Sequence, residues 1–224
     1  MFIKQVTLFS SFLKETKDFY AVHLGFPLLS EDDISFEVQA GASRLKFQTY
    51  DEEGSPFYHF AFNIPKNLFH AAKEWAKTRV VLNKEDGEDE VYFQSIDASS
   101  LYFQDPSGNI VELIARHSVS RASENSVFSA EEILSVGEIS TTTNDVITVG
   151  KRMLQLGFPV MRDEPLDADN LNFIGEYEDG AFFLLVPRKR RWYFSNRESE
   201  IYPVSIALDD GRIIKLNEKG EMNT

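Results

Sequence analysis

Two residues that can do chemistry, a carboxylate and an imidazole, each stand among apolar neighbours. In "LYFQDPSGNIVELI", residues 101–114, Glu112 lies inside an apolar run. An unpaired charge is costly to bury, so Glu112 must face solvent or have a partner. His59 stands between two aromatic residues in "FYHFAFNIP", residues 57–65. A lone histidine there is on its own a core or rim residue bonded to backbone, whereas a paired one can bind metal.

Composition excludes several kinds of chemistry. The chain has no cysteine, which excludes disulfides, thiolate catalysis and Cys-ligated zinc. A formal charge of −13 argues against a nucleic-acid partner, because phosphate backbones require clustered cations. We interpret the basic cluster "RKRRW" at 188–192 as a solvated turn, and the acidic "EDGEDE" at 85–90 as a solvated loop without EF-hand spacing.

Hydropathy predicts no membrane partner. No apolar stretch approaches ~18 residues, and the N-terminal "MFIKQVTLFSS" is not followed by the apolar region and cleavage site of a signal peptide. A cytoplasmic location is therefore expected.

The elements that would position Glu112 and His59 follow a repeated pattern. Residues 2–9 predict a strand, and 12–24 predict an amphipathic helix that Gly25 ends. Three short strands are expected next, at 26–30, 34–39 and 43–50. The order of strand, helix and strands returns over 57–115. A strand is expected at 57–65, a helix at 67–79, and four strands near 80–82, 91–96, 100–104 and 110–115.

A third copy begins after residue 133. "HLGFPLL" at 23–29 reappears as "QLGFPVM" at 155–161, and "YPVSIAL" at 202–208 starts a fourth copy with few residues left. Such repeats indicate one supersecondary unit copied along the chain. The fold class predicted is α+β, with paired β-α-β-β-β modules, a third module, and a fourth truncated to a strand and a short tail.

The expected domain organisation follows from these repeats. A complete domain is predicted over 1–115, built from modules 1–50 and 57–115. A polar linker follows at 116–133, and an incomplete second domain at 134–224.

The tandem modules, the "FY…LGF" exit from the first helix and "DPSGNIVEL" together resemble the vicinal oxygen chelate superfamily. That superfamily includes glyoxalase I, extradiol dioxygenases and bleomycin-resistance proteins. The resemblance covers 1–115 well and 134–208 weakly. It implies that paired modules form a cupped mixed sheet, in which a divalent metal binds neighbouring oxygens of a small-molecule substrate.

Residue by residue, the resemblance implies a metal site of Gln5, His59 and Glu112. Glu112 is also the catalytic residue implied, because the family's glutamate can act as general base. The last strand of the first module offers Phe47 or Gln48, neither of them an acid, so the second carboxylate of glyoxalase I is missing. Such a ligand set could hold Zn, Ni, Mn or Fe.

The second half of the chain resembles the family less. Its matching positions hold Glu138, where the first module has Gln5, and Ser205, where the second has His59. We expect this half to serve packing or a homodimer contact rather than chemistry.

The function expected is therefore that of a metal-dependent enzyme acting on a substrate with adjacent oxygens. Lyase or isomerase chemistry is favoured over ring-cleaving dioxygenation, because the two-His-one-carboxylate set suited to Fe(II) is incomplete. The alternative is a non-catalytic small-molecule binding protein, like the bleomycin-resistance members. The partner in both cases is a small molecule, and neither nucleic acid nor membrane is expected.

Overall fold

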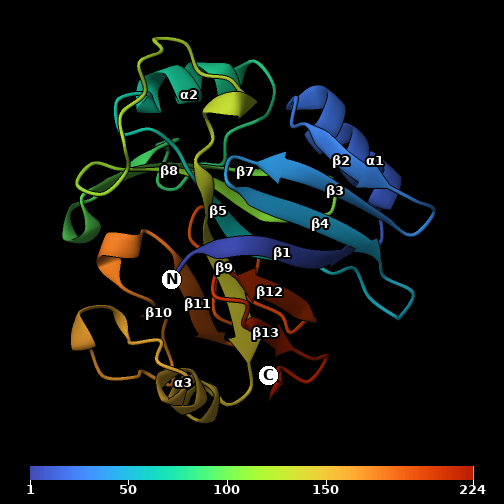
Figure 1. Ribbon diagram of the computed structural model, residues 1–224, viewed down its shortest axis with the longest axis vertical. Helices are drawn as coiled ribbons and strands as arrows, with labels where there is room; N and C mark the ends of the chain where they lie inside the picture. The colour runs from blue at the N-terminus through green and yellow to red at the C-terminus, as the bar shows by residue number, and fades with distance from the viewer. Residues whose placement is uncertain (224) are drawn as a thin grey trace.

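The alternating apolar patterns form two seven-stranded mixed sheets in the computed structural model, which describes residues 1–223 (Figure 1). The first module comprises β1 (Ile3–Ser10), α1 (Leu13–Lys17) continued by the π-helical η1 (Asp18–His23), β2 (Leu28–Glu31), β3 (Ser35–Ala40) and β4 (Ser43–Thr49). The second comprises β5 (His59–Asn63), α2 (Phe69–Lys77), β6 (Val91–Phe93), the short helix η2 (Gln94–Ile96), β7 (Ala98–Gln104) and β8 (Ile110–Arg116).

The second half of the chain adds fewer strands. After the short helix η3 (Ala130–Glu132), the third module comprises β9 (Ser135–Thr143), α3 (Val146–Gln155), η4 (Met161–Asp163), β10 (Asn172–Ile174), η5 (Tyr177–Asp179) and β11 (Phe182–Pro187). The fourth comprises β12 (Val204–Leu208), β13 (Ile213–Leu216) and β14 (Met222–Asn223). No helix in residues 1–223 is both long and apolar enough to cross a membrane.

These elements confirm the α+β class and its repeated modules, with differences of detail. Gly25, with φ +80°, ends the first helical segment as expected. The strand predicted at 80–82 is only an isolated bridge between Leu82 and Phe103. The fourth module is longer than expected, because two further antiparallel strands follow β12.

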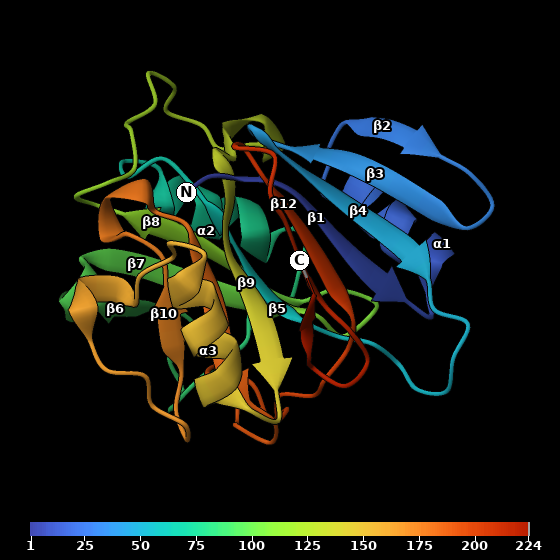
Figure 2. The same ribbon diagram turned by 60° about the horizontal axis from the view of Figure 1, so that its bottom comes forward.

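Consecutive modules of the predicted first domain, 1–50 and 57–115, do not share a sheet. β1 pairs antiparallel with β12, so the first module shares a sheet with the truncated fourth. β5 pairs antiparallel with β9, so the second module shares a sheet with the third (Figure 2). Each sheet therefore combines residues from both sides of the predicted 116–133 linker. The first strand of every complete module would otherwise be an unpaired edge, which proteins avoid by pairing or covering it.

The main core lies between the two sheets and under the helices. One cluster of buried residues joins Val6 and Leu8 of β1 to Phe60 and Phe62 of β5. Burying a large apolar side chain contributes roughly 1.5–3 kcal/mol, so these phenylalanines hold the sheets together. Because side chains alternate along a strand, Gln5 points away from this core.

The turn "DPSGN" between β7 and β8 ties the second module to the first. Asp105 accepts hydrogen bonds from the Asn109 backbone N–H (2.9 Å), the Asn109 side-chain amide (2.7 Å) and the Tyr20 hydroxyl of η1 (2.8 Å). Gly108 has φ +78°, a conformation that favours glycine. Burial of Asp105 raises the pKa of its carboxyl to about 6, against the hydrogen bonds that lower it.

Asp105 is therefore expected to make the fold more stable in mild acid. The folded state binds its proton more tightly than the unfolded state, so the gain is complete below pH ~4 and is lost as pH rises through about 6. Relative to Asp105→Asn, which does not titrate, the wild-type free energy of unfolding should rise by roughly 2–3 kcal/mol from pH 7 to pH 4. Urea unfolding at both pH values measures this, and a constant difference between the two proteins would contradict it.

Candidate metal centre

Glu112 lies in the middle of β8, which has neighbours on both sides. Its register partners are Ala61 on β5 and Tyr102 on β7. The residue is only 2% exposed, so the solvated alternative for this carboxylate is excluded and a partner is required.

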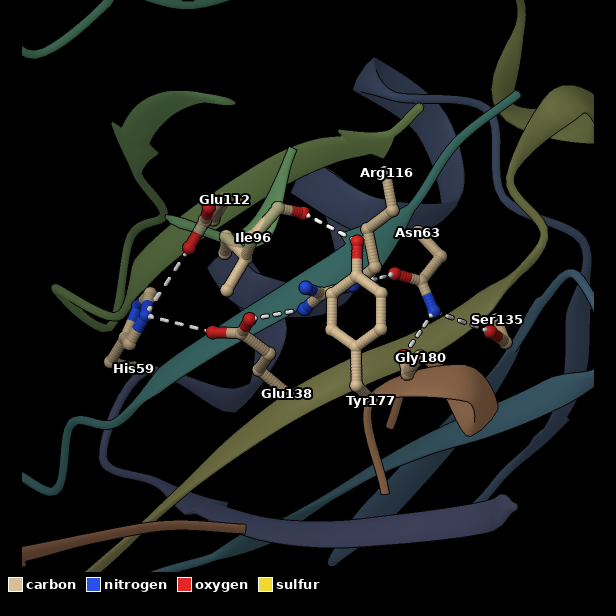
Figure 3. Close-up of polar contacts among 9 residues, drawn as sticks. All are labelled: His59, Asn63, Ile96, Glu112, Arg116, Ser135, Glu138, Tyr177 and Gly180. Carbon is tan, nitrogen blue, oxygen red and sulfur yellow. Dashed lines mark hydrogen bonds and ion pairs between the residues drawn. The ribbon is translucent and has the colours of Figure 1, made fainter. Parts of the chain in front are cut away.

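The partner is His59, the first residue of β5. Its Nε2 lies 3.4 Å from Glu112 Oε2 and 4.0 Å from Oε2 of Glu138 on β9 (Figure 3). The other ring nitrogen, Nδ1, lies 2.9 Å from the Ile110 carbonyl oxygen, to which it donates when protonated. In the neutral ring this bond leaves the Nε2 lone pair facing both carboxylates.

A β-bulge brings Glu138 to this face. The pairing of β5 with β9 shifts register at Gly137, since Ala61 pairs with Glu138 while Phe62 pairs with Val136. The extra residue turns both Ser135 and Glu138 toward the same side, although residues three apart in a regular strand face opposite sides. A glycine is needed there because a Cβ on Gly137 would clash with the side-chain amide of the buried Asn63.

Gly137→Ala is accordingly expected to lower the free energy of unfolding by about 1–3 kcal/mol, as overpacking typically does. The cost should shrink in an Asn63→Ala background, where the clashing amide is gone. Thermal unfolding of the four proteins of this cycle measures the coupling. If Gly137→Ala lowered the free energy of unfolding equally in both backgrounds, the contact with Asn63 would not be the reason for the glycine.

The buried charges of the cluster shift the pKa values of His59 and Glu138. Burial lowers the pKa of His59, but the hydrogen bond and charge of Glu112 and the charge of Glu138 outweigh it, so that the His59 pKa is raised. Burial and the charge of Glu112 raise the pKa of Glu138, while Arg116 and His59 oppose this rise.

These donors fit a divalent metal. One ligand atom each from His59, Glu112 and Glu138 lies within 4.8 Å of the others, and all three side chains are buried. An imidazole with two carboxylates suits Mn, Fe, Zn or related ions, whose charge the carboxylates would neutralise. The position of the Nε2 lone pair, fixed by the Ile110 carbonyl, is the arrangement that metal-binding histidines commonly have.

The cluster forms part of the wall of a cavity of about 550 Å³. Aromatic side chains and arginines make up much of the remaining wall, among them Phe93, Tyr102, Phe173, Trp192, Tyr193, Arg162, Arg190 and Arg191. The Trp192 ring lies 4.9 Å from the His59 ring, and the Tyr102 ring stacks on Phe194 at 4.7 Å. Such a cavity has the size and character of a small-molecule site.

The basic segment "RKRRW" does more than form a solvated turn. Trp192 is only 4% exposed and lies against His59, and Arg190 lines the cavity. Arg191 forms an ion pair with Glu85, so the segment is also joined to the acidic loop 85–90.

The structure brings together two of the three sequence-predicted ligands. His59 and Glu112 meet, while Gln5 lies on the other sheet, in a separate groove of about 420 Å³. That groove also contains Lys46 and Ser205. Gln5 pairs with Ala207 as Glu138 pairs with Ala61, so the two grooves correspond, but Ser205 stands there at the position that His59 has in the cluster.

Glu138 takes the place in the cluster that sequence reasoning gave to Gln5. The spacing of the repeat indicates that Glu138 and Gln5 are equivalent, because Glu138 precedes Leu156 by 18 residues and Gln5 precedes Leu24 by 19. Both residues occupy one position of the repeat, and the partner module decides which of them reaches His59. The third module thus contributes to the cluster, beyond the packing role expected for the second half.

The remaining histidines stay outside the cluster. His23 and His70 are exposed and His117 is half-buried, near the surface positions predicted for them. His117 Nε2 lies 2.9 Å from the Ser99 hydroxyl.

Comparisons with known proteins agree with this architecture. A family model for toxoflavin-degrading enzyme matches residues 136–190, and comparison with curated proteins gives no match. A proposed dioxygenase from Bacillus subtilis subsp. subtilis str. 168 superposes with a TM-score of 0.59 at 15% identity, covering 83% of this chain and 63% of that one. Lactoylglutathione lyase from Agrobacterium tumefaciens gives 0.42 at 18%, covering 50% and 91%.

At such identities the solved structures show the fold alone. The model of the Glyoxalase/Bleomycin resistance protein/Dioxygenase superfamily matches residues 2–113, which is half of the sequence. This match includes the first two modules and, with them, His59 and Glu112. The chain therefore belongs to the Glyoxalase/Bleomycin resistance protein/Dioxygenase superfamily.

Proposed function

We propose that the protein is a metal-dependent enzyme that transforms a planar small molecule with neighbouring oxygen atoms. The observation that carries the proposal is the buried His59–Glu112–Glu138 cluster in the wall of an aromatic cavity. These three side chains would hold a divalent ion. When bound, the ion would supply Lewis-acid polarisation of substrate oxygens.

Two side chains of the cavity wall would supply the general base and a hydrogen bond to the substrate. Glu112 is the candidate general base, because its carboxylate lies in the cavity wall and contacts His59. Tyr102 lies beside it in register, and burial together with the charges of Glu112 and Glu138 raises the pKa of its phenol well above the usual range. Tyr102 would therefore remain protonated and donate a hydrogen bond to a substrate oxygen.

Lyase or isomerase chemistry is the reaction type we favour. The donor set has one imidazole and two carboxylates, whereas Fe(II) oxygenases commonly use two imidazoles and one carboxylate. Carboxylate oxygens suit hard divalent ions such as Mn, which can polarise a substrate oxygen as a Lewis acid.

The cavity wall supports a planar, electron-poor or oxygen-rich substrate. Aromatic rings of Phe93, Phe173 and Trp192 offer stacking surfaces. Arg162 and Arg190 also line the cavity, and each donates to a backbone carbonyl, leaving the guanidinium charge available for substrate oxygens. Because residues 136–190 match the toxoflavin-degrading enzyme model, we propose toxoflavin or a related heteroaromatic as the substrate class.

Turnover of toxoflavin by the metal-loaded protein tests this proposal. We expect loss of toxoflavin absorbance that requires Mn²⁺ or another added divalent ion and that falls at least ~100-fold in Glu112→Gln. An oxygen electrode run in parallel separates the reaction types, since stoichiometric dioxygen uptake would replace the lyase or isomerase assignment by an oxygenase one. Absence of turnover with every ion tried would contradict enzymatic action on this compound.

Binding without chemistry is the second candidate. The stacking surfaces of the cavity do not depend on the metal ligands, so they would hold a flat ligand in either case. Saturable toxoflavin binding that is equal in wild type and Glu112→Gln, with no turnover in either, would favour this function.

A further inference from the structure

Arg116 is a buried cation at the end of β8. It is the largest of the side chains that are fully removed from solvent. Its Nη2 donates a hydrogen bond to Glu138 Oε1, and its Nε donates to Asn63 Oδ1 at 3.2 Å (Figure 3). The guanidinium also lies over the Phe182 ring, 5.1 Å from its centroid. A charge so deeply buried requires close partners, and the carboxylate of Glu138 supplies the main one.

Arg116 and Asn63 occupy equivalent positions on the neighbouring strands β8 and β5. Arg116 follows Glu112 by four residues on β8, and Asn63 follows His59 by four on β5, so each pair shares a face. Asn63 is itself held, because its amide nitrogen donates to the Gly180 carbonyl (2.8 Å) and to the Ser135 hydroxyl (3.2 Å). Arg116 and Asn63 thus form a second layer of polar side chains behind the ligand cluster, and the Gly180 carbonyl helps to orient it.

The two oxygens of Glu138 have different surroundings. Oε1 accepts the hydrogen bond from Arg116, while Oε2 faces His59 Nε2 at 4.0 Å. We propose that Arg116 is a positioning residue that commits Glu138 to bind the metal through Oε2 alone. This inference rests on the metal-dependent function proposed above. Its consequence is that the cluster offers a fixed number of donor atoms and leaves more of the ion's coordination positions for substrate.

A purely structural role accounts less well for these contacts. Buried ion pairs are often replaceable by apolar residues of similar volume at little cost in stability, so stability alone is a weak reason for one. Residues that orient metal ligands, by contrast, typically contribute 10–100-fold to metal affinity.

Mn²⁺ binding to the full chain tests the role without requiring turnover. Free Mn²⁺ is measured by its electron paramagnetic resonance signal during titration of metal-stripped protein. We expect Arg116→Met to weaken binding by about 10–100-fold, because the Glu138 carboxylate is no longer held with Oε2 toward His59. The spectrum of the bound ion should also change, because Oε1 can then take the place of Oε2. Arg116→Lys should recover part of the affinity, since an ammonium group can reach Glu138 but lacks the planar fork that also contacts Asn63.

Arg197→Met is the matched control, because Arg197 lies over the Phe57 ring and donates to the Gly108 carbonyl, outside the ligand cluster. It should bind Mn²⁺ as wild type does. Folded Arg116→Met or Arg116→Lys protein with wild-type affinity and an unchanged bound spectrum would overturn the inference while leaving the metal centre intact. If wild type itself bound no divalent ion, the proposed function would fail and the inference with it. Should Arg116→Met not fold, the spectrum and affinity of Arg116→Lys decide.

Discussion

His59→Ala should abolish tight binding of divalent metal and, with it, any metal-dependent turnover. His59 is the only nitrogen donor of the three-residue cluster, and its Nε2 faces both carboxylates. Without it two buried carboxylates remain close together, and an ion would lack its neutral ligand. We expect the dissociation constant for Mn²⁺ or Zn²⁺ to rise more than about 100-fold, beyond the 10–100-fold effect of residues that only support ligands.

Isothermal titration calorimetry of metal-stripped protein measures this change. His70→Ala is the control, because His70 is exposed on α2 and away from the cluster. The circular dichroism spectrum of both variants should match wild type. If His59→Ala were folded and still bound the ion with near-native affinity, His59 would not be a ligand.

Glu138→Gln is expected to have the second large effect. The change is nearly isosteric, and the new amide oxygen can still accept from Arg116, but the negative charge is lost. An amide is a neutral and weaker donor, so metal affinity should fall by at least ~10-fold and turnover with it. The same measurement on Gln5→Ala should give wild-type values, since Gln5 lies in the groove of the other sheet.

This pair of variants separates the ligand set given by the structure from the set expected on family resemblance. The set His59, Glu112 and Glu138 requires sensitivity at position 138 and none at position 5. The set Gln5, His59 and Glu112 requires the reverse. If Gln5→Ala lost most of its metal affinity while Glu138→Gln bound the ion as wild type does, the modules would have to pair differently from the sheets described above.

Local sequence patterns predict much of this fold. Apolar runs and alternation locate β1, β5 and β8, and the repeated "LGFP" marks the end of the helical segments in the first and third modules. These features depend on neighbours within a few residues, so a single sequence carries them. The apolar setting of Glu112 narrows the acid to two alternatives, a solvated face or a partner, and the structure has the second.

Long-range pairing is what the sequence leaves open. Whether β5 pairs with β1 or with β9 depends on edges that meet only in the folded chain, and both strands have similar lengths and begin a module. That choice decides whether Gln5 or Glu138 reaches His59. Gly137 is a local hint, because a glycine inside a strand pattern often marks a bulge, but its effect on Glu138 depends on the same pairing.

The position of segment 188–192 likewise depends on contacts with residues distant in the sequence. Its charges predict a solvated turn, yet the chain after β11 returns over the cavity and places Trp192 against His59. An aromatic residue at the end of a basic run is compatible with either outcome until the neighbouring strands are known. The residues that shape the cavity were therefore harder to predict than those that form the strands.

Anomalous diffraction from crystals of the protein soaked in Mn²⁺ tests the central claim most directly. A single strong peak is expected, bonded to His59 Nε2 and to one carboxylate oxygen each of Glu112 and Glu138, at about 2.0–2.3 Å. No peak in that cavity, or a peak beside Gln5 in the groove of the other sheet, would contradict the account.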